Sequence, residues 1–97
     1  MEGRITTVGS LLWRDRRSST TSAVVERLLA AGMIPIGKTH MVEFAFGAWG
    51  TNPTMGMPWN PWDADVHRIT GGSSSGSAVA VAGGLVRGHP PSMRAVT

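Results

Sequence analysis

One glycine- and serine-rich run, GGSSSGS at residues 71–77, holds the residues best suited to chemistry. It leads directly into AVAVAGG at residues 78–84, which carries no charge and only small residues. A glycine-rich turn that opens onto a helix presents backbone N–H groups and the positive end of the helix dipole, which suits an anion or an oxyanion. Because Ala78 follows Ser77 and the run contains no lysine, it is not a phosphate-binding loop. A functional hydroxyl-rich loop and a structural turn both stay open.

A helix and a strand are predicted upstream of this run. Aliphatic side chains recur at helical spacing through residues 23–32. Thr21 or Ser22 can cap the start of this helix, and Gly32 can adopt the left-handed conformation that ends it. The apolar run MIPIG at residues 33–37 then predicts a short strand, which makes an αβ unit whose proline suits a strand end or an edge.

The middle of the chain is predicted to be a long loop. After a second short helix at residues 41–46, glycine, proline, asparagine and tryptophan dominate residues 47–70, where neither period holds. Loops of this length often bind ligands. We expect the tryptophans to pin this loop to the body beneath it, with ligand stacking as the alternative. A helix over residues 78–84 would be apolar all round and would need burial on every side, as in the centre of a larger domain.

Composition excludes several classes of protein. Of the 97 residues, 41% are hydrophobic and only 15% are charged, which argues against a disordered chain. So low a charged fraction is typical of the interior of a larger domain. There is no cysteine, and His40, His67 and His89 form no ligand pair, so neither a metal nor another cofactor is expected. Scattered arginines predict no nucleic-acid binding. No apolar run approaches the roughly 18 residues of a membrane helix, and a cytoplasmic location is the default.

The run GGSSSGSAVAVAGGL at residues 71–85 resembles the signature of the amidase signature family, the serine amidohydrolases that cleave carboxamides. Two more blocks resemble the same family: VVERLLAAGMIPIGKTHMVEFAFG at residues 24–47 and the turn NPWD at residues 60–63. The blocks lie in family order, and the resemblance covers residues 5–86. It implies the α/β class, with an α/β/α fold around a mixed β-sheet. This chain would hold a fragment of that fold with an incomplete core.

The resemblance also implies a mechanism with three catalytic groups. A nucleophilic serine attacks the amide, a second serine in a cis peptide relays its proton, and a neutral lysine is the final base. The match places the relay serine at Ser73, after Gly72. Loop positions that the match assigns to oxyanion or loop support are Gly71, Gly72, Ser74 and Ser75.

The other two catalytic groups do not carry over. Lys38 is the only lysine, but GKTH resembles a structural segment of the family, so we expect a structural lysine there. The family's nucleophile would fall near Thr97, where the Gly-Gly-Ser turn is missing, and neither Thr97 nor Ser92 is expected to replace it. His40 stands where the family commonly has asparagine, and we expect a hydrogen-bonding role in packing for it, without catalysis.

The resemblance divides the chain into a partial amidase signature domain at residues 1–86 and an unrelated tail at residues 87–97, such as a frameshift or truncation would leave. It implies hydrolysis of a small-molecule carboxamide by acyl transfer through serine. The chain alone is expected to be inactive. Whether it takes part in an enzyme is left open. The alternatives are a remnant that aggregates through an exposed core, a piece of a split amidase with a complementing polypeptide, and a relic of a tRNA-amidotransferase-type protein. The aromatic loop at residues 47–63 favours the small-molecule amidases.

Overall fold

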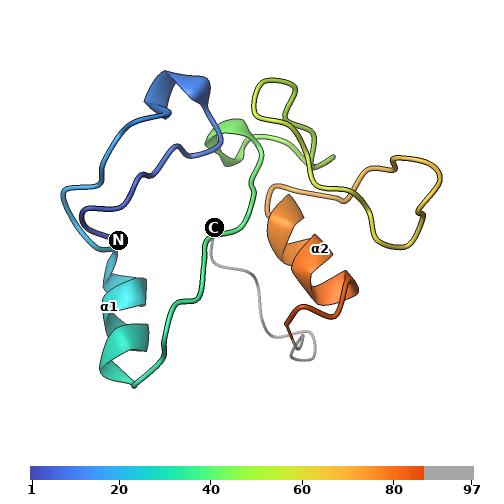
Figure 1. Cartoon of the computed structure of the whole chain (residues 1–97). Helices are drawn as coiled ribbons and strands as arrows, with labels where there is room; N and C mark the ends of the chain where they lie inside the picture. Colours follow the sequence, from blue (N-terminus) through green and yellow to red (C-terminus); the bar gives the residue numbers. More distant parts are fainter. Residues whose placement is uncertain (87–97) are drawn as a thin grey trace. The chain divides into compact units, whose positions relative to one another are not determined.

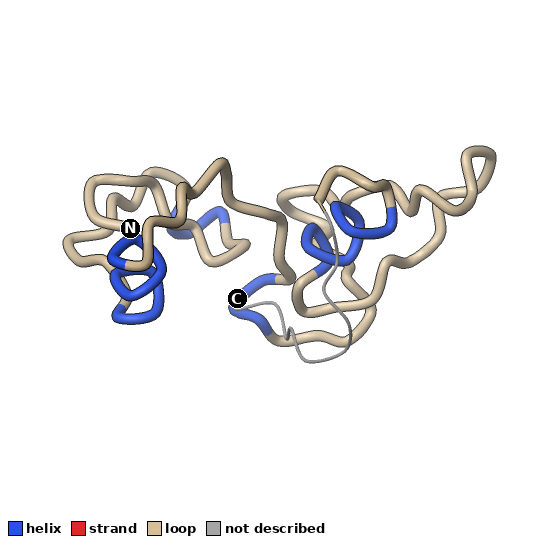
Figure 2. The backbone as a smooth tube through the Cα atoms, turned by 90° about the horizontal axis from the view of Figure 1, so that it is seen from below, coloured by secondary structure: helices blue, strands red, loops and turns tan. Residues whose placement is uncertain are grey.

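The computed structural model describes residues 1–86 of the chain, and its helices are short (Figures 1 and 2). In chain order they are the 3-10 helix η1 (Leu11–Trp13), the α-helix α1 (Ala23–Ala30), the 3-10 helix η2 (Glu43–Ala45) and the α-helix α2 (Ser75–Ala82). No helix within the described residues is long and apolar enough to cross a membrane.

The chain divides into two compact units. The first unit comprises Met1–Thr7 and Leu11–Lys38, and it contains η1 and α1. Within the described residues, the second unit comprises Val8–Ser10 and residues 39–86, and it contains η2, the long loop and α2. The serine-rich run and the segment that contacts it therefore lie in one unit.

In the first unit, two backbone segments meet in an antiparallel arrangement. An isolated β-bridge joins Ile5 and Arg17. Next to it, the backbone N–H of Thr6 donates to the carbonyl oxygen of Arg16 at 2.8 Å. The Arg16 guanidinium carbon lies 4.7 Å from the centre of the Trp13 ring, which is a cation–π geometry. These contacts hold the turn that η1 occupies.

Helix α1 confirms the predicted helix. Ser22 occupies the N-cap position, although its side chain makes no capping hydrogen bond. Gly32 has a φ of +82°, and its N–H donates to the carbonyl oxygen of Leu29 at 2.9 Å. The N–H of Met33 donates to the carbonyl oxygen of Leu28 at 3.0 Å. The left-handed glycine therefore ends the helix as its sequence predicted.

The predicted α/β fold with a mixed β-sheet is wrong for this chain. Residues 1–86 contain no β-strand, and their one β-bridge is isolated. The predicted strand at residues 33–37 is exposed, with 84% of Ile34 and 89% of Ile36 accessible to solvent. A strand requires a neighbour for its N–H and C=O groups, and no described segment pairs with this one. Apolar composition alone does not supply that neighbour.

In the second unit, the predicted helix at residues 41–46 shortens to the single turn η2. Phe44 and Ala45 have φ values of +50° and +59°, which interrupt a regular helix. Val42 precedes this turn, and it is the only buried hydrophobic side chain among the described residues, at 6% exposure. The fully buried side chains are polar: Asn52, Ser10 and Ser75. The interior of this unit therefore depends on hydrogen bonds more than on apolar packing.

Asn52 organises the first part of the long loop. It is 1% exposed, and its Nδ2 donates to the carbonyl oxygens of Gly9 at 2.6 Å and Met41 at 3.4 Å. Its Oδ1 accepts from the Thr54 hydroxyl at 2.9 Å and from the Met55 N–H at 3.0 Å. One buried amide thus satisfies backbone groups of three segments that a loop would otherwise leave unpaired.

Helix α2 begins within the serine-rich run, at Ser75, in agreement with the predicted turn into a helix. Ser75 is its only buried residue, and 47% of Val81 is exposed. The burial on every side that its apolar sequence predicted is therefore not present within residues 1–86. Figure 1 shows α2 in orange.

Candidate functional site

Residues 71–74 of the serine-rich run form a tight turn, and α2 begins at Ser75. Gly71 has a φ of +74°, a conformation that favours glycine. The peptide bond between Gly72 and Ser73 is cis. Ser74 occupies the N-cap position of α2 and makes no side-chain capping hydrogen bond. The N–H of Gly76 donates to the carbonyl oxygen of His40, and those of Ser77 and Ala78 donate to the carbonyl oxygen of Ser74. Within the described residues, the backbone donors that the turn can offer therefore precede Gly76.

A second segment, residues 39–42, lies beside the serine-rich run. The backbone N–H of Val42 donates to the carbonyl oxygen of Ser73 at 2.9 Å. The backbone N–H of Gly76 donates to the carbonyl oxygen of His40, also at 2.9 Å. The two hydrogen bonds anchor the turn at Ser73 and at the first turn of α2.

Side chains add to this backbone contact. The Thr39 and Ser77 hydroxyl oxygens lie 2.9 Å apart and share a hydrogen bond. A Cβ atom on Gly76 would collide with the backbone of His40, so only glycine permits this close approach. Sequence reasoning did not identify Thr39 as a support of the loop, because a pair separated by 38 residues leaves no periodic signal in the sequence.

His40 and Ser75 form the most buried polar contact of the site. Ser75 is completely buried, and its Oγ lies 2.7 Å from Nδ1 of His40. The Ser75 hydroxyl also lies 3.5 Å from the carbonyl oxygen of His40. The predicted hydrogen-bonding role of His40 is therefore confirmed, and its partner is the first residue of α2.

The other side of the turn lies close to the start of the long loop. A Cβ on Gly72 would lie 2.8 Å from both the carbonyl oxygen of Gly47 and the backbone N of Gly50. Gly50 itself has a φ of +80°, and a Cβ there would collide with the carbonyl oxygen of Gly71. Glycine is required at Gly50 and Gly72 for the two backbones to pack this closely.

Lys38, the only lysine, lies in the first unit, where its ammonium donates to the carbonyl oxygen of Ile5. The candidate positions His89, Ser92 and Thr97 lie outside the described residues. Within residues 1–86, no group of three or more histidine, aspartate or glutamate side chains could hold a metal ion.

The sequence predicted that the tryptophans pin the long loop to the body beneath it, and this prediction is wrong. Trp49 and Trp62 are 66% and 84% exposed. Trp59 instead stacks on His67, with ring centres 4.4 Å apart and an interplanar angle of 12°. Nε2 of His67 lies 3.2 Å from the carbonyl oxygen of Pro58, which can only accept, so this nitrogen carries the proton.

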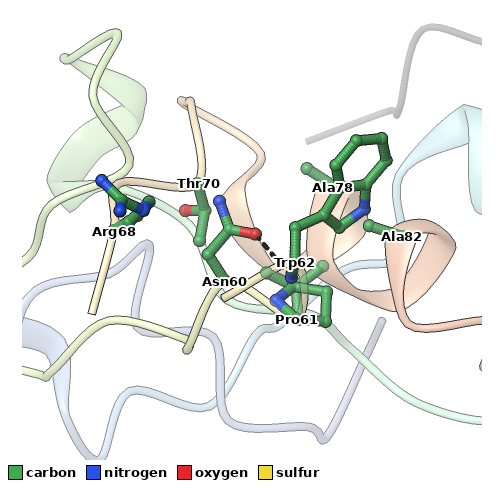
Figure 3. A pocket seen from close by; sticks show the side chains of 8 residues that line it. Asn60, Pro61, Trp62, Arg68, Thr70, Ala78 and Ala82 are labelled. Carbon is green, nitrogen blue, oxygen red and sulfur yellow. Dashed lines mark hydrogen bonds between the residues drawn. The ribbon is translucent and has the colours of Figure 1, made fainter. Parts of the chain in front are cut away.

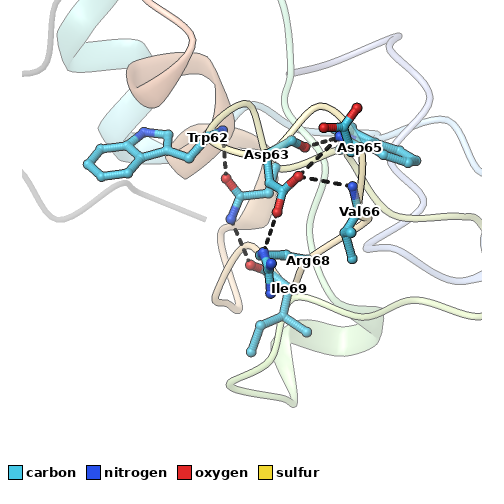
Figure 4. Close-up of polar contacts among 8 residues, drawn as sticks. Trp62, Asp63, Asp65, Val66, Arg68 and Ile69 are labelled. Carbon is cyan, nitrogen blue, oxygen red and sulfur yellow. Dashed lines mark hydrogen bonds and ion pairs between the residues drawn. The ribbon is translucent and has the colours of Figure 1, made fainter.

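Asp63 holds the turn that precedes the serine-rich run (Figure 4). Its Oδ1 accepts from the backbone N–H groups of Asp65 and Val66, each at 3.0 Å. Its Oδ2 lies 2.6 Å from Nε of Arg68 in a salt bridge. The hydrogen bond from Val66, followed by those from Arg68 and Asp65, lowers the pKa of Asp63 from its ordinary value of 3.8.

A pocket of about 380 Å³ lies between this turn and α2 (Figure 3). Its lining consists of Asn60, Pro61, Trp62, Arg68, Thr70, Ala78, Val79 and Ala82. Helix α2 supplies an apolar wall, and Asn60, Arg68 and Thr70 supply polar groups. The pocket can therefore receive an apolar group that carries a hydrogen-bonding atom.

Comparison with known proteins gives a family match over almost the whole chain. The model of the amidase family matches residues 1–88. A glutamyl-tRNA(Gln) amidotransferase subunit of Cupriavidus pinatubonensis is 51% identical over 79 residues, which are 81% of this chain and 15% of that protein. No solved structure matches the chain.

The corresponding amidotransferase subunits of other bacteria match similarly. That of Symbiobacterium thermophilum is 49% identical over 82 residues, which are 84% of this chain and 16% of that protein. That of Syntrophobacter fumaroxidans is 44% identical over 88 residues, which are 91% of this chain and 18% of that protein. The chain thus spans 15% to 18% of the length of these curated relatives.

Proposed function

This chain belongs to the amidase family, and from this premise we propose that residues 71–77 supply the proton-relay serine of an amidase active site. Ser73 is the relay. A nucleophilic serine and a neutral lysine come from polypeptide outside these 97 residues. The reaction is hydrolysis of a carboxamide C–N bond by acyl transfer.

In this reaction the nucleophilic serine attacks the carboxamide carbon and gives its proton to Ser73, while Ser73 gives its own hydroxyl proton to the lysine amine. N–H groups of the turn at residues 71–75 stabilise the oxyanion. Collapse of the tetrahedral intermediate breaks the C–N bond. The proton held by the lysine returns through Ser73 to the leaving nitrogen, which departs as ammonia or an amine. Water then hydrolyses the acyl ester and restores the serine.

The observation that carries this proposal is how Ser73 is held. Its carbonyl oxygen accepts the hydrogen bond from Val42, and α2 begins two residues later. Its hydroxyl has no hydrogen-bond partner within the described residues, and the side chain is half-buried. A relay between a nucleophilic serine and a lysine requires a fixed backbone and an available hydroxyl.

The relatives favour one branch of the family. Their names describe them as subunits of glutamyl-tRNA(Gln) amidotransferase, at 44% to 51% identity. We therefore favour the amidotransferase type of amidase over the stand-alone small-molecule amidase that the aromatic loop suggested.

A complementing polypeptide is part of the proposal. Several large apolar side chains are at least three-quarters exposed within residues 1–86: Leu12, Ile34, Ile36, Phe46, Trp62 and Leu85. Exposure of this extent favours contact with further protein, and aggregation is the alternative outcome for the isolated chain. The remaining part of an amidase domain would supply both the covering surface and the two missing catalytic groups.

A segment exchange tests the proposed function. The matched 79 residues of the Cupriavidus pinatubonensis relative are replaced by the corresponding residues of this chain. Ammonia release from glutamine, an aliphatic amide and an aryl amide is compared with that of the unaltered relative and of a variant lacking the segment. We expect the chimera to release ammonia and the deletion variant to release none. A folded chimera that releases no ammonia from an amide that the relative hydrolyses would overturn the proposal.

A further inference from the structure

A buried contact between His40 and Ser75 joins residues 39–42 to the serine-rich run. Nδ1 of His40 lies 2.7 Å from Oγ of the completely buried Ser75. The carbonyl oxygen of the same histidine accepts the N–H of Gly76 at 2.9 Å. One residue therefore contacts two consecutive residues at the start of α2, once through its side chain and once through its backbone.

The hydrogen-bond pattern selects one tautomer of His40. The Ser75 hydroxyl can donate to the carbonyl oxygen of His40, 3.5 Å away, while it accepts a proton from Nδ1. The opposite tautomer would place an N–H on Nε2, which is buried and has no partner within the described residues. A buried N–H without a partner is rarer in proteins than a buried acceptor without one. The Nδ1–H tautomer fits both contacts.

We propose that His40, in its Nδ1–H tautomer, is a positioning residue for Ser73. Ser73 lies two residues before Ser75, and its carbonyl oxygen is bound by Val42, two residues after His40. The Val42 contact fixes one end of the Ser73–Ser75 segment, and the His40 side chain fixes the other. The catalytic consequence of this inference rests on the proposed function, whereas the contact itself does not.

The first test needs no activity. The imidazole nitrogens of the 97-residue chain are labelled with 15N, and His40→Asn assigns the His40 signals by their loss. Protonated and unprotonated ring nitrogens give separate resonances. We expect a protonated Nδ1 and an unprotonated Nε2, and Ser75→Ala is expected to shift both signals. A proton on Nε2, or signals unchanged by Ser75→Ala, overturns the inference even if the chimera is fully active.

The second test uses the chimera and three variants of one residue. His40→Asn keeps a polar group near the position of Nδ1, His40→Gln keeps one near Nε2, and His40→Phe keeps neither. We expect kcat to stay within about twofold in His40→Asn and to fall about tenfold in His40→Gln and His40→Phe, the scale of one lost hydrogen bond, with KM unchanged. After Ser75→Ala, His40→Gln should have no further effect. Equal kcat values in the Asn and Gln variants overturn the positioning role.

Discussion

The backbone N–H of Val42 donates to the carbonyl oxygen of Ser73 at 2.9 Å, across 31 positions of sequence. Val42 is also the only buried hydrophobic side chain among residues 1–86. Core packing and the position of the candidate relay serine thus depend on the same residue. The two contributions can be separated because one belongs to the side chain and the other to the backbone.

Val42→Pro removes the N–H donor while keeping the backbone conformation, because Val42 already has a φ of −64°, close to that of proline. Val42→Ala removes side-chain packing but keeps the donor, and it is the matched control. We expect Val42→Pro to lower the free energy of unfolding by about 0.5–1.5 kcal/mol more than Val42→Ala does. Urea denaturation measures the difference, and equal values for the two variants would show that the hydrogen bond contributes nothing.

Gly76→Ala tests the close approach of residues 39–42 to the serine-rich run. Alanine has the higher helix propensity, but its Cβ would collide with the His40 backbone. We expect the collision to dominate and to lower the free energy of unfolding by about 1–3 kcal/mol. Gly37→Ala is the control, since Gly37 has open space around it and no positive φ, and its effect should stay within about 0.5 kcal/mol. A Gly76→Ala variant as stable as the parent would refute the close contact.

Asn52→Asp tests the buried amide of the long loop. The exchange removes the Nδ2 donor and places a carboxylate against the carbonyl oxygens of Gly9 and Met41. We expect a loss of about 1–3 kcal/mol in the free energy of unfolding at neutral pH. Asn60→Asp is the matched control, because it loses a 3.0 Å bond to Ile69 at a more exposed site. Equal losses in the two variants, measured by urea denaturation, would contradict the role assigned to Asn52.

The pH dependence of the turn before the serines follows from Asp63. Its pKa is lowered in the folded chain, chiefly by the Val66 N–H and then by Arg68 and Asp65. A lowered pKa stabilises the fold above the ordinary value of 3.8, and this contribution disappears as the pH falls through the folded-state pKa. Asp63→Asn should therefore remove part of the stability loss on acidification, as measured by denaturation between neutral and acidic pH. An unchanged pH profile, with Asp15→Asn as control, would contradict this assignment.

Features with local determinants could be predicted from the sequence. Helix α1 follows from the spacing of its aliphatic side chains and from Gly32, all within a few residues of one another. The turn from the serine-rich run into α2 follows from glycines and serines ahead of small residues. The loop between η2 and this run follows from its glycines, prolines and asparagines.

Features with distant determinants could not be predicted. The strand expected at residues 33–37 lacks a pairing partner among the described residues, and apolar composition does not reveal whether a partner exists. The pair of His40 and Ser75 spans 35 residues, and Asn52 contacts Gly9 across 43. Hydrogen bonds at these separations have no periodic signature, so only the structure shows which polar residues are buried.

The central claim is that Ser73 relays a proton, and its most direct test is kcat for ammonia release by the chimera with Ser73→Ala. Ser22→Ala is the matched control, because the Ser22 side chain makes no capping hydrogen bond. The account predicts that Ser73→Ala lowers kcat by about 10²- to 10⁴-fold, the usual contribution of a proton-transfer group, and that the control stays unchanged. A folded Ser73→Ala chimera with kcat within about twofold of its parent, well below the smallest proton-transfer effect, would contradict the account.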